Sequence, residues 1–342
     1  MELPINVYHW TEAVPKVELH LHLEGAIPLP TLYELIRKYG GSSEVPDLQA
    51  LDDRFTFIDF PHFIETWLWK AEYHREYEDF TLIAEAVAHD LKRQNILYAE
   101  TFFSPSDYAR HGLTPSGLTE AIHKGLKKVE GIEIKLIPDL VRMNHPAKSL
   151  EILEEVAEMK DFGVIGVGLG GPEHEFPPEP FAAVLSRARE LGLHTTAHAG
   201  EAAGPSSIWG ALQALGAERI GHAARAGDDP KLIAYLMEKQ IPLEMCPLSN
   251  IRTGVVKEYG MHPVKQFYES GLLVTINTDD PKMFNNSLAE EYQMLMTQHG
   301  FTLQDIQQVI TNAVKSSWLD DKDKQVLLAR VQNHPGWQVE NS

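Results

Sequence analysis

Eight short runs of apolar and β-branched residues recur through most of the chain at intervals of about 20 to 40 residues. Each run has the length of a strand and is followed by a segment with the apolar spacing of a helix, as in residues 149–163 and 181–192. Strands that alternate with helices favour a parallel sheet, and eight such units predict an α/β protein with a closed (β/α)8 TIM barrel. The runs begin at Val17, Ile96, Ile132, Val164, Leu193, Glu218, Ile241 and Leu272.

The segment between the first two runs, residues 28–95, is longer than one crossover helix requires. Residues 59–94 have the spacing of two or three helices, which we interpret as extra helices inserted after the first strand, at the top of the barrel. Trp67 and Trp69 in this segment could line a pocket, but packing is the more common role of large aromatic residues. No short repeat, low-complexity linker or change in composition divides the chain, so we expect a single domain over residues 1–342.

The charge and the cysteine content exclude several classes of protein. A formal net charge of −19, with no basic cluster, disfavours nucleic acid and anionic membranes and favours a small neutral or weakly charged substrate. The N-terminal residues lack the pattern of a signal peptide, and no apolar run is long enough for a transmembrane helix, so we expect a cytoplasmic protein. Cys246 is the only cysteine, which leaves no intrachain disulfide and no thiolate zinc cluster. The sequence indicates no particular oligomeric state.

Two histidines stand one residue apart in the first run, within the sequence VELHLHLEGA. Side chains at positions i and i+2 of a strand share one face, so His20 and His22 can converge on a single metal ion. On its own, such a pair is more often part of a solvated strand face. The metal interpretation therefore depends on what the other strands carry.

Polar residues also stand where three other predicted strands end. His198 in HAGE ends the fifth run, His222 in GH ends the sixth, and Asp279 and Asp280 in NTDDP end the eighth. Each feature alone is typical of packing or of a helix start, but a barrel of this class carries its chemistry at the carboxyl ends of its strands. Histidine nitrogens and a carboxylate oxygen suit a catalytic zinc ion, which keeps one position open for water. The predicted ligands of one Zn²⁺ per chain are His20, His22, His198 and Asp279.

The motifs PKVELHLHLEGA, HAGE, GH and NTDDP, in this order and spacing, resemble those of the adenosine deaminase family of zinc aminohydrolases. The resemblance runs from about Pro15 to about Tyr292 and implies a (β/α)8 barrel with one catalytic zinc on the four ligands named above. It further implies that Glu201 is the proton donor, that His222 orients the attacking water, and that Asp280 is the second aspartate of the site. The family's substrate-binding positions are matched by His22, Glu24, Gly171 and Asp280.

The chemistry of 6-aminopurine deamination gives these roles a physical reason. Zinc can lower the pKa of a ligand water from 15.7 to about 7, and the hydroxide so made available attacks C6 of the purine. Attack moves electron density onto N1, and a carboxylic acid such as Glu201, three positions after His198, is well placed to protonate that nitrogen. Asp280 could also contact N7, and a glycine at Gly171 lets the backbone approach the flat ring near N3. Without the resemblance, the glycines from Gly168 to Gly171 could equally form a simple bend.

The sequence departs from typical adenosine deaminases near the expected sugar side of the pocket. Glu24 replaces an aspartate, and GLGGPE replaces an aspartate-rich DLAGDE. Adenosine and 2′-deoxyadenosine are the expected substrates, ahead of adenine and then of 6-aminodeoxyfutalosine, whose benzoate would need a basic residue such as Arg142. A longer side chain at Glu24 is expected to reach further into the sugar region than an aspartate.

Two other functions are compatible with a metal site on a barrel. A non-catalytic purine-binding barrel would not require Glu201, since protonation of N1 serves only the reaction. A hydrolase of amides or phosphoesters would commonly hold two metals bridged by a lysine carboxylate, but no lysine ends the predicted fourth strand. Deaminases built on HxE and PCxxC motifs are excluded by the single cysteine.

Overall fold

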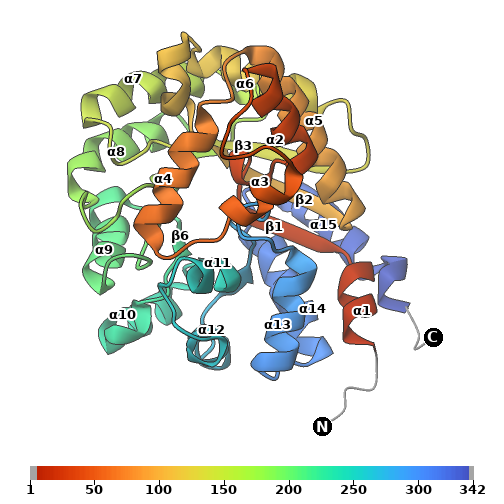
Figure 1. Ribbon diagram of the computed structural model, residues 1–342. Helices are drawn as coiled ribbons and strands as arrows, with labels where there is room; N and C mark the ends of the chain where they lie inside the picture. The colour runs from red at the N-terminus through yellow and green to blue at the C-terminus, as the bar shows by residue number, and fades with distance from the viewer. Residues whose placement is uncertain (1–5, 339–342) are drawn as a thin grey trace.

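The eight predicted runs form eight strands in the computed structural model, which describes residues 6–338 (Figure 1). Every strand pairs in parallel with its neighbour in sequence wherever a ladder is formed. The alternation of strands and helices predicted the number, order and direction of the strands correctly. The strands are β1 (Lys16–His22), β2 (Ile96–Phe103), β3 (Glu133–Pro138), β4 (Gly166–Val167), β5 (His194–Ala199), β6 (Arg219–His222), β7 (Leu243–Met245) and β8 (Val274–Ile276).

The ladders form one group from β1 to β3 and a second from β4 to β8, and two seams close them into a barrel. Parallel bridges from Leu136 to Val164 and from Asp139 to Gly168 join β3 to the β4 segment. The β8–β1 seam is made at Asp279, whose N–H donates to the His20 carbonyl at 3.0 Å and whose carbonyl accepts from the backbone N–H of residue 22 at 2.8 Å. The closed (β/α)8 barrel expected from the sequence is therefore confirmed.

Side chains reinforce the β8–β1 seam where the backbone ladder is short. The N–H of Leu19 donates to Asn277 Oδ1 at 2.9 Å, and the N–H of Thr278 donates to Glu18 Oε1 at 2.7 Å. All seven residues of β1 are buried, as expected for a parallel strand covered on both faces. Valine and leucine alternate along β1 with Glu18, His20 and His22, and the two histidines extend from this strand into the site described below.

Amphipathic helices cover the outside of the barrel and connect successive strands. Their ends follow ordinary capping rules, as where Thr114 Oγ1 accepts the N–H of Gly117 at 3.1 Å and Pro115 occupies the first turn of α6. These helices are α5 (Tyr77–Arg93), α6 (Pro115–Leu126), α7 (Pro146–Ala157), α8 (Ala182–Glu190), α9 (Pro205–Gly210), α10 (Pro230–Lys239), α11 (Pro247–Arg252), α12 (Val264–Glu269), α13 (Leu288–Gln298), α14 (Leu303–Ser316) and α15 (Asp321–Gln332).

Three helices precede α5 in the segment after β1: α2 (Leu29–Lys38), α3 (Leu48–Arg54) and α4 (Phe60–Ala71). Asp59 caps α4 by accepting the N–H of His62 at 3.0 Å. In Figure 1, α4 is drawn in orange in front of the barrel strands, and several of its side chains line the main pocket. The predicted insertion of helices at the top of the barrel is confirmed, with α4 and α5 as the two helices of residues 59–94.

The first and last described elements lie side by side. Helix α1 (Val7–Ala13) packs against α13, and the Trp10 ring centroid lies 5.7 Å from that of Trp337 in the 3-10 turn η8 (Pro335–Gln338). Figure 1 shows the red α1 beside the blue C-terminal elements. Among residues 6–338, no helix combines the length and the apolar character that crossing a membrane requires.

Candidate active site

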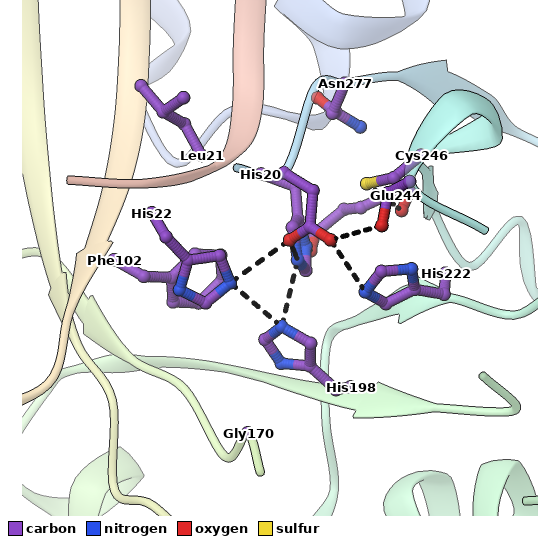
Figure 2. Close-up of polar contacts among 12 residues, drawn as sticks. His20, Leu21, His22, Phe102, Gly170, His198, His222, Glu244, Cys246 and Asn277 are labelled. Carbon is purple, nitrogen blue, oxygen red and sulfur yellow. Dashed lines mark hydrogen bonds and ion pairs between the residues drawn. The ribbon is translucent and has the colours of Figure 1, made fainter. Parts of the chain in front are cut away.

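Three imidazoles and one carboxylate converge at the carboxyl end of the barrel. His198 Nε2 lies 3.0 Å from His20 Nε2 and 3.1 Å from His22 Nε2. Asp279 Oδ1 lies 3.4 Å and 3.3 Å from the same two nitrogens. Figure 2 shows the rings of His20, His22 and His198 directed at a common centre, with the ring of His222 beside it. The four predicted ligand residues are therefore brought together by β1, β5 and the segment after β8.

The spacing of these donor atoms fits a zinc ion. Ligands about 2.0 to 2.2 Å from zinc stand about 3.3 Å apart in a tetrahedral site and somewhat closer when a fifth ligand is present. The set of three nitrogens and one oxygen also matches zinc's preference, and His20, His198 and Asp279 are nearly fully buried. His222 has a nitrogen within 4.8 Å of the donors of His20, His198 and Asp279. We favour His22 as the ligand because its Nε2 is the closer of the two to the Asp279 carboxylate.

A buried network of ion pairs and hydrogen bonds supports the predicted metal ligands. Glu244 Oε2 lies 2.8 Å from His20 Nδ1, an arrangement that orients a metal-bound imidazole and raises its basicity. The other oxygen of Glu244 pairs with Arg219 Nε at 2.5 Å, and Arg219 Nη1 pairs with Glu100 at 2.6 Å. Ser249 Oγ donates to Asp279 Oδ2 at 2.7 Å. None of these four supporting residues was predicted, although a glutamate in the middle of the apolar run IPLEMCP was a usable signal.

Glu201 stands next to the cluster on the loop after β5. Burial raises the pKa of its carboxyl well above the usual range, and the nearby charges of Asp279 and Glu173 raise it further. The loop that carries it is fixed by Glu173, which accepts the N–H groups of Gly200 at 2.5 Å, Glu201 at 3.0 Å and Ala203 at 3.0 Å. The arrangement holds a carboxyl with a raised pKa at one orientation beside the predicted metal ligands.

Glu173→Gln is expected to lower kcat by about 10- to 100-fold without loss of zinc, because an amide NH₂ would face backbone N–H donors and misplace the Glu201 loop. Steady-state kinetics and metal analysis of the purified variant provide the measurement. Glu175→Gln, at an exposed position two residues on, is the matched control and should behave as the wild type. Wild-type kcat in the Glu173 variant would show that this carboxylate does not position Glu201.

His222 lies on the other side of Glu201, at the end of β6. Its Nε2 is 3.6 Å from Glu201 Oε2 and 3.9 Å from Asp279 Oδ2. Burial lowers the pKa of its imidazole to about 3, so the ring is neutral. His222 and Ala223 both have positive φ, at 62° and 55°, and this strained turn aims the ring back at the cluster.

Asp280 is buried beside Asp279 and lines the pocket. Burial, followed by the neighbouring charge of Asp279, raises the pKa of its carboxyl to about 7. A Cβ atom at Gly25 would stand 1.8 Å from Asp280 Oδ1, so only glycine permits this close approach. Among the described residues, Asp280 Oδ1 has no hydrogen-bond partner, which leaves it available to a ligand.

A pocket opens from the cluster, with about 640 Å³ of empty space when the open solvent at its mouth is included. Its inner wall carries the polar groups described above together with Gly171, which has a φ of 100°. Asp107 and Asp139 also face it, and Trp67 Nε1 donates to Asp107 Oδ2 at 3.1 Å. Trp67 both lines the pocket and packs against Phe63, with ring centroids 6.2 Å apart, whereas Trp69 packs against Tyr73. The apolar outer wall consists of Phe60, Phe63, Ile64, Trp67, Leu68, Val141, Met143 and Pro172.

Two residues expected near the sugar do not line this pocket. Glu24 is buried behind it, where its Oε1 accepts the N–H of Ser104 at 2.9 Å and lies 3.4 Å from the Tyr108 hydroxyl. Arg142 is also fully buried, and its guanidinium donates to the carbonyls of Phe176 at 2.8 Å and His198 at 2.7 Å. A direct contact of Glu24 with substrate stays a prediction, and Arg142 is engaged elsewhere.

Comparison with known proteins matches residues 15–334 to the family model described as adenosine deaminase. The chain is 37% identical to an aminodeoxyfutalosine deaminase of Streptomyces coelicolor, over 94% of this chain and 85% of that protein. It is 35% identical to an adenine deaminase of Bordetella avium, over 90% and 98% of the two chains, and 34% identical to an adenosine deaminase of Shewanella denitrificans, over 93% and 98%.

Solved structures are also similar to this chain. An adenine deaminase from Arthrobacter aurescens superposes with a TM-score of 0.89 at 29% identity, over 93% of this chain and 98% of that one. An amidohydrolase from Burkholderia ambifaria, crystallised with bound zinc, superposes with a TM-score of 0.90 at 27% identity, over 99% and 94% of the two chains.

Proposed function

Because the chain belongs to the adenosine deaminase family of zinc-dependent aminohydrolases, we propose that it converts adenosine and 2′-deoxyadenosine to inosine and 2′-deoxyinosine, with release of ammonia. The relatives, named as aminodeoxyfutalosine, adenine and adenosine deaminases, together support the more general activity, deamination of a 6-aminopurine. The observation that carries the proposal is the buried Glu201 carboxyl, whose pKa is raised by burial, next to four converging metal-binding groups in one pocket.

The residues of the pocket divide the work of this reaction. His20, His22, His198 and Asp279 would hold a zinc ion, which when bound would make a nucleophile available at neutral pH by lowering the pKa of a ligand water to about 7.

Glu201 holds the proton that N1 of the base needs as C6 is attacked, and His222 hydrogen-bonds the attacking oxygen and fixes its direction. Asp280 accepts or donates a hydrogen bond at N7, and the backbone at Gly171 meets N3.

The charge of the pocket wall supports a neutral, hydroxyl-bearing group on N9. Asp107 and Asp139 face the cavity, and no lysine or arginine lines it among the described residues. Carboxylates accept hydrogen bonds from ribose hydroxyls, whereas they repel a benzoate at short range. The pocket also extends beyond the metal cluster to an apolar outer wall.

Deamination of 6-aminodeoxyfutalosine is the second candidate function. It is favoured by the 37% identity to the Streptomyces coelicolor protein and by the aromatic outer wall, where Phe60, Phe63 and Trp67 could contact a benzene ring. The acidic wall and the engaged guanidinium of Arg142 weigh against its carboxylate. Adenine deamination would leave Asp107 and Asp139 without a ligand partner.

We expect adenosine to have the highest kcat/KM when adenosine, 2′-deoxyadenosine, adenine and 6-aminodeoxyfutalosine are compared on one zinc-loaded preparation by loss of absorbance. A preference of 100-fold or more for adenine or for 6-aminodeoxyfutalosine, about 2.7 kcal/mol, would overturn this ranking. Asp139→Asn is an informative companion, since it removes one charge from the wall but keeps an oxygen for the N–H of Gly170. It should lower kcat/KM for adenosine and raise it for 6-aminodeoxyfutalosine.

A further inference from the structure

A further buried histidine, His262, is connected to the site by hydrogen bonds, although its position between β7 and β8 gave no sign of this in the sequence. Its Nδ1 accepts the backbone N–H of Val264 at 3.2 Å, so Nδ1 carries no proton. A neutral imidazole with an unprotonated Nδ1 carries its proton on Nε2. That nitrogen lies 3.1 Å from Asn250 Oδ1 and therefore donates to it.

This donation fixes the orientation of the Asn250 amide. With Oδ1 turned to His262, the amide NH₂ is turned to His222 Nδ1, at 3.1 Å. Asn250 itself is held in α11, where its N–H donates to the Cys246 carbonyl at 3.0 Å and its carbonyl accepts from the N–H of residue 256 at 2.8 Å. All three side chains are nearly fully buried, so water does not compete for these bonds.

The amide in turn determines which nitrogen of His222 is protonated. A nitrogen that accepts from an amide NH₂ has no proton of its own, so the proton of the neutral His222 ring stands on Nε2. This Nε2 faces Glu201 and Asp279 and not the backbone. The direction of the hydrogen bonds is thus set from the Val264 N–H through two side chains to the site.

We propose that Asn250 and His262 are positioning residues that keep the proton of His222 on Nε2, so that His222 donates a hydrogen bond into the site and cannot act as a metal ligand. The position of the proton matters because an unprotonated Nε2 of His222 would offer a lone pair within 4.8 Å of the donor atoms of His20, His198 and Asp279. The catalytic meaning of this inference rests on the proposed function, whereas the protonation pattern of the ring does not.

The first test is Asn250→Asp, which has nearly the same shape but replaces the donor NH₂ with an acceptor oxygen. We expect His222 to shift its proton to Nδ1, and kcat to fall by about 100-fold or more with KM within about threefold and zinc retained. The ¹⁵N chemical shifts of histidine-labelled protein distinguish a protonated from an unprotonated ring nitrogen. A wild-type His222 protonated on Nδ1, or an Asn250→Asp protein with wild-type kcat, would overturn the proposal.

The second test does not depend on the folding of that variant. His262→Gln keeps an N–H donor for Asn250 and should retain kcat within about tenfold, while His262→Leu removes the donor, releases the amide and should lose about 10- to 100-fold. Equal kcat in the Gln and Leu variants would contradict the proposed relay, the chain of hydrogen bonds from His262 through Asn250 to His222. His123→Asn, which alters a histidine bonded to the Phe162 carbonyl far from the site, is the control.

Different results would contradict the proposed function and the proposed relay. If none of the four purines is deaminated by the wild type, the proposed function fails, but the ¹⁵N shifts of His222 in the wild type and in Asn250→Asp still test the relay. If adenosine is deaminated and those shifts do not respond to the Asn250 substitution, the relay fails and the proposed function stands.

Discussion

A Glu201→Gln protein is expected to keep its zinc and to lose about 10²- to 10⁴-fold in kcat. The amide has nearly the shape of the carboxyl group, so the Glu173 contacts to the backbone of this loop should persist. What disappears is a carboxyl group whose pKa is raised by burial and by the neighbouring charges of Asp279 and Glu173, and which can carry a proton to the base. An amide cannot deliver that proton to N1 of the purine.

The measurement combines zinc analysis with steady-state kinetics on the same preparation. KM should change little, because the substituted group acts mainly in the transition state. A zinc-replete Glu201→Gln protein with near-normal kcat would show that another group protonates the base. Loss of zinc in this variant would instead place Glu201 among the groups that hold the metal.

His198→Ala is expected to remove both the metal and the turnover, with kcat below about one thousandth of that of the wild type. The methyl group offers no lone pair, and His198 Nε2 is the donor atom shared by the contacts to His20 and His22. Chelation of zinc from the wild type should have the same effect on activity and should lower Tm, since a metal that binds only the folded state stabilises it.

His194→Ala is the matched control for this experiment, because His194 begins the strand on which His198 stands. Its ring is stacked on Trp318 and pairs with Glu218 at 2.7 Å, at the opposite end of the barrel from the site. This variant should bind zinc and turn over substrate as the wild type does. Full activity of a metal-free protein, prepared by either route, would refute the metal requirement.

The fold and the metal-binding cluster were predictable because both are encoded locally. Each strand begins close to the start of its apolar run, and His20, His22, His198 and Asp279 stand at or just beyond strand ends, which a barrel brings together whatever its details. The ladder of β4 is shorter than its run suggested, because beyond Val167 this segment keeps only an isolated parallel bridge from Gly168 to Asp139.

The supporting residues depend on register and packing that a single sequence does not reveal. Glu244 reaches His20 across the barrel from a strand that is not its neighbour, and Asn250 in α11 meets His262 in the segment before α12. The direction of the Glu24 side chain was also not predictable, because strand alternation would place it on the same face as the side chain of His22. The chain leaves the strand at His22 for the 3-10 turn η1 (Glu24–Ala26), so that alternation no longer applies. The Glu24 carboxylate instead accepts the backbone N–H of Ser104.

The seam between β8 and β1 has a consequence for how the protein is made. Its bonds join residues 257 to 260 positions apart, and Asp279, a predicted ligand, is itself the backbone partner that closes it. During synthesis at about 5 to 20 residues per second, the N-terminal strand must wait for nearly the whole chain before its last neighbour exists. Contacts of such high sequence separation form late and slowly. The four predicted ligands therefore come together only as the barrel closes, so a complete zinc site requires the closed barrel.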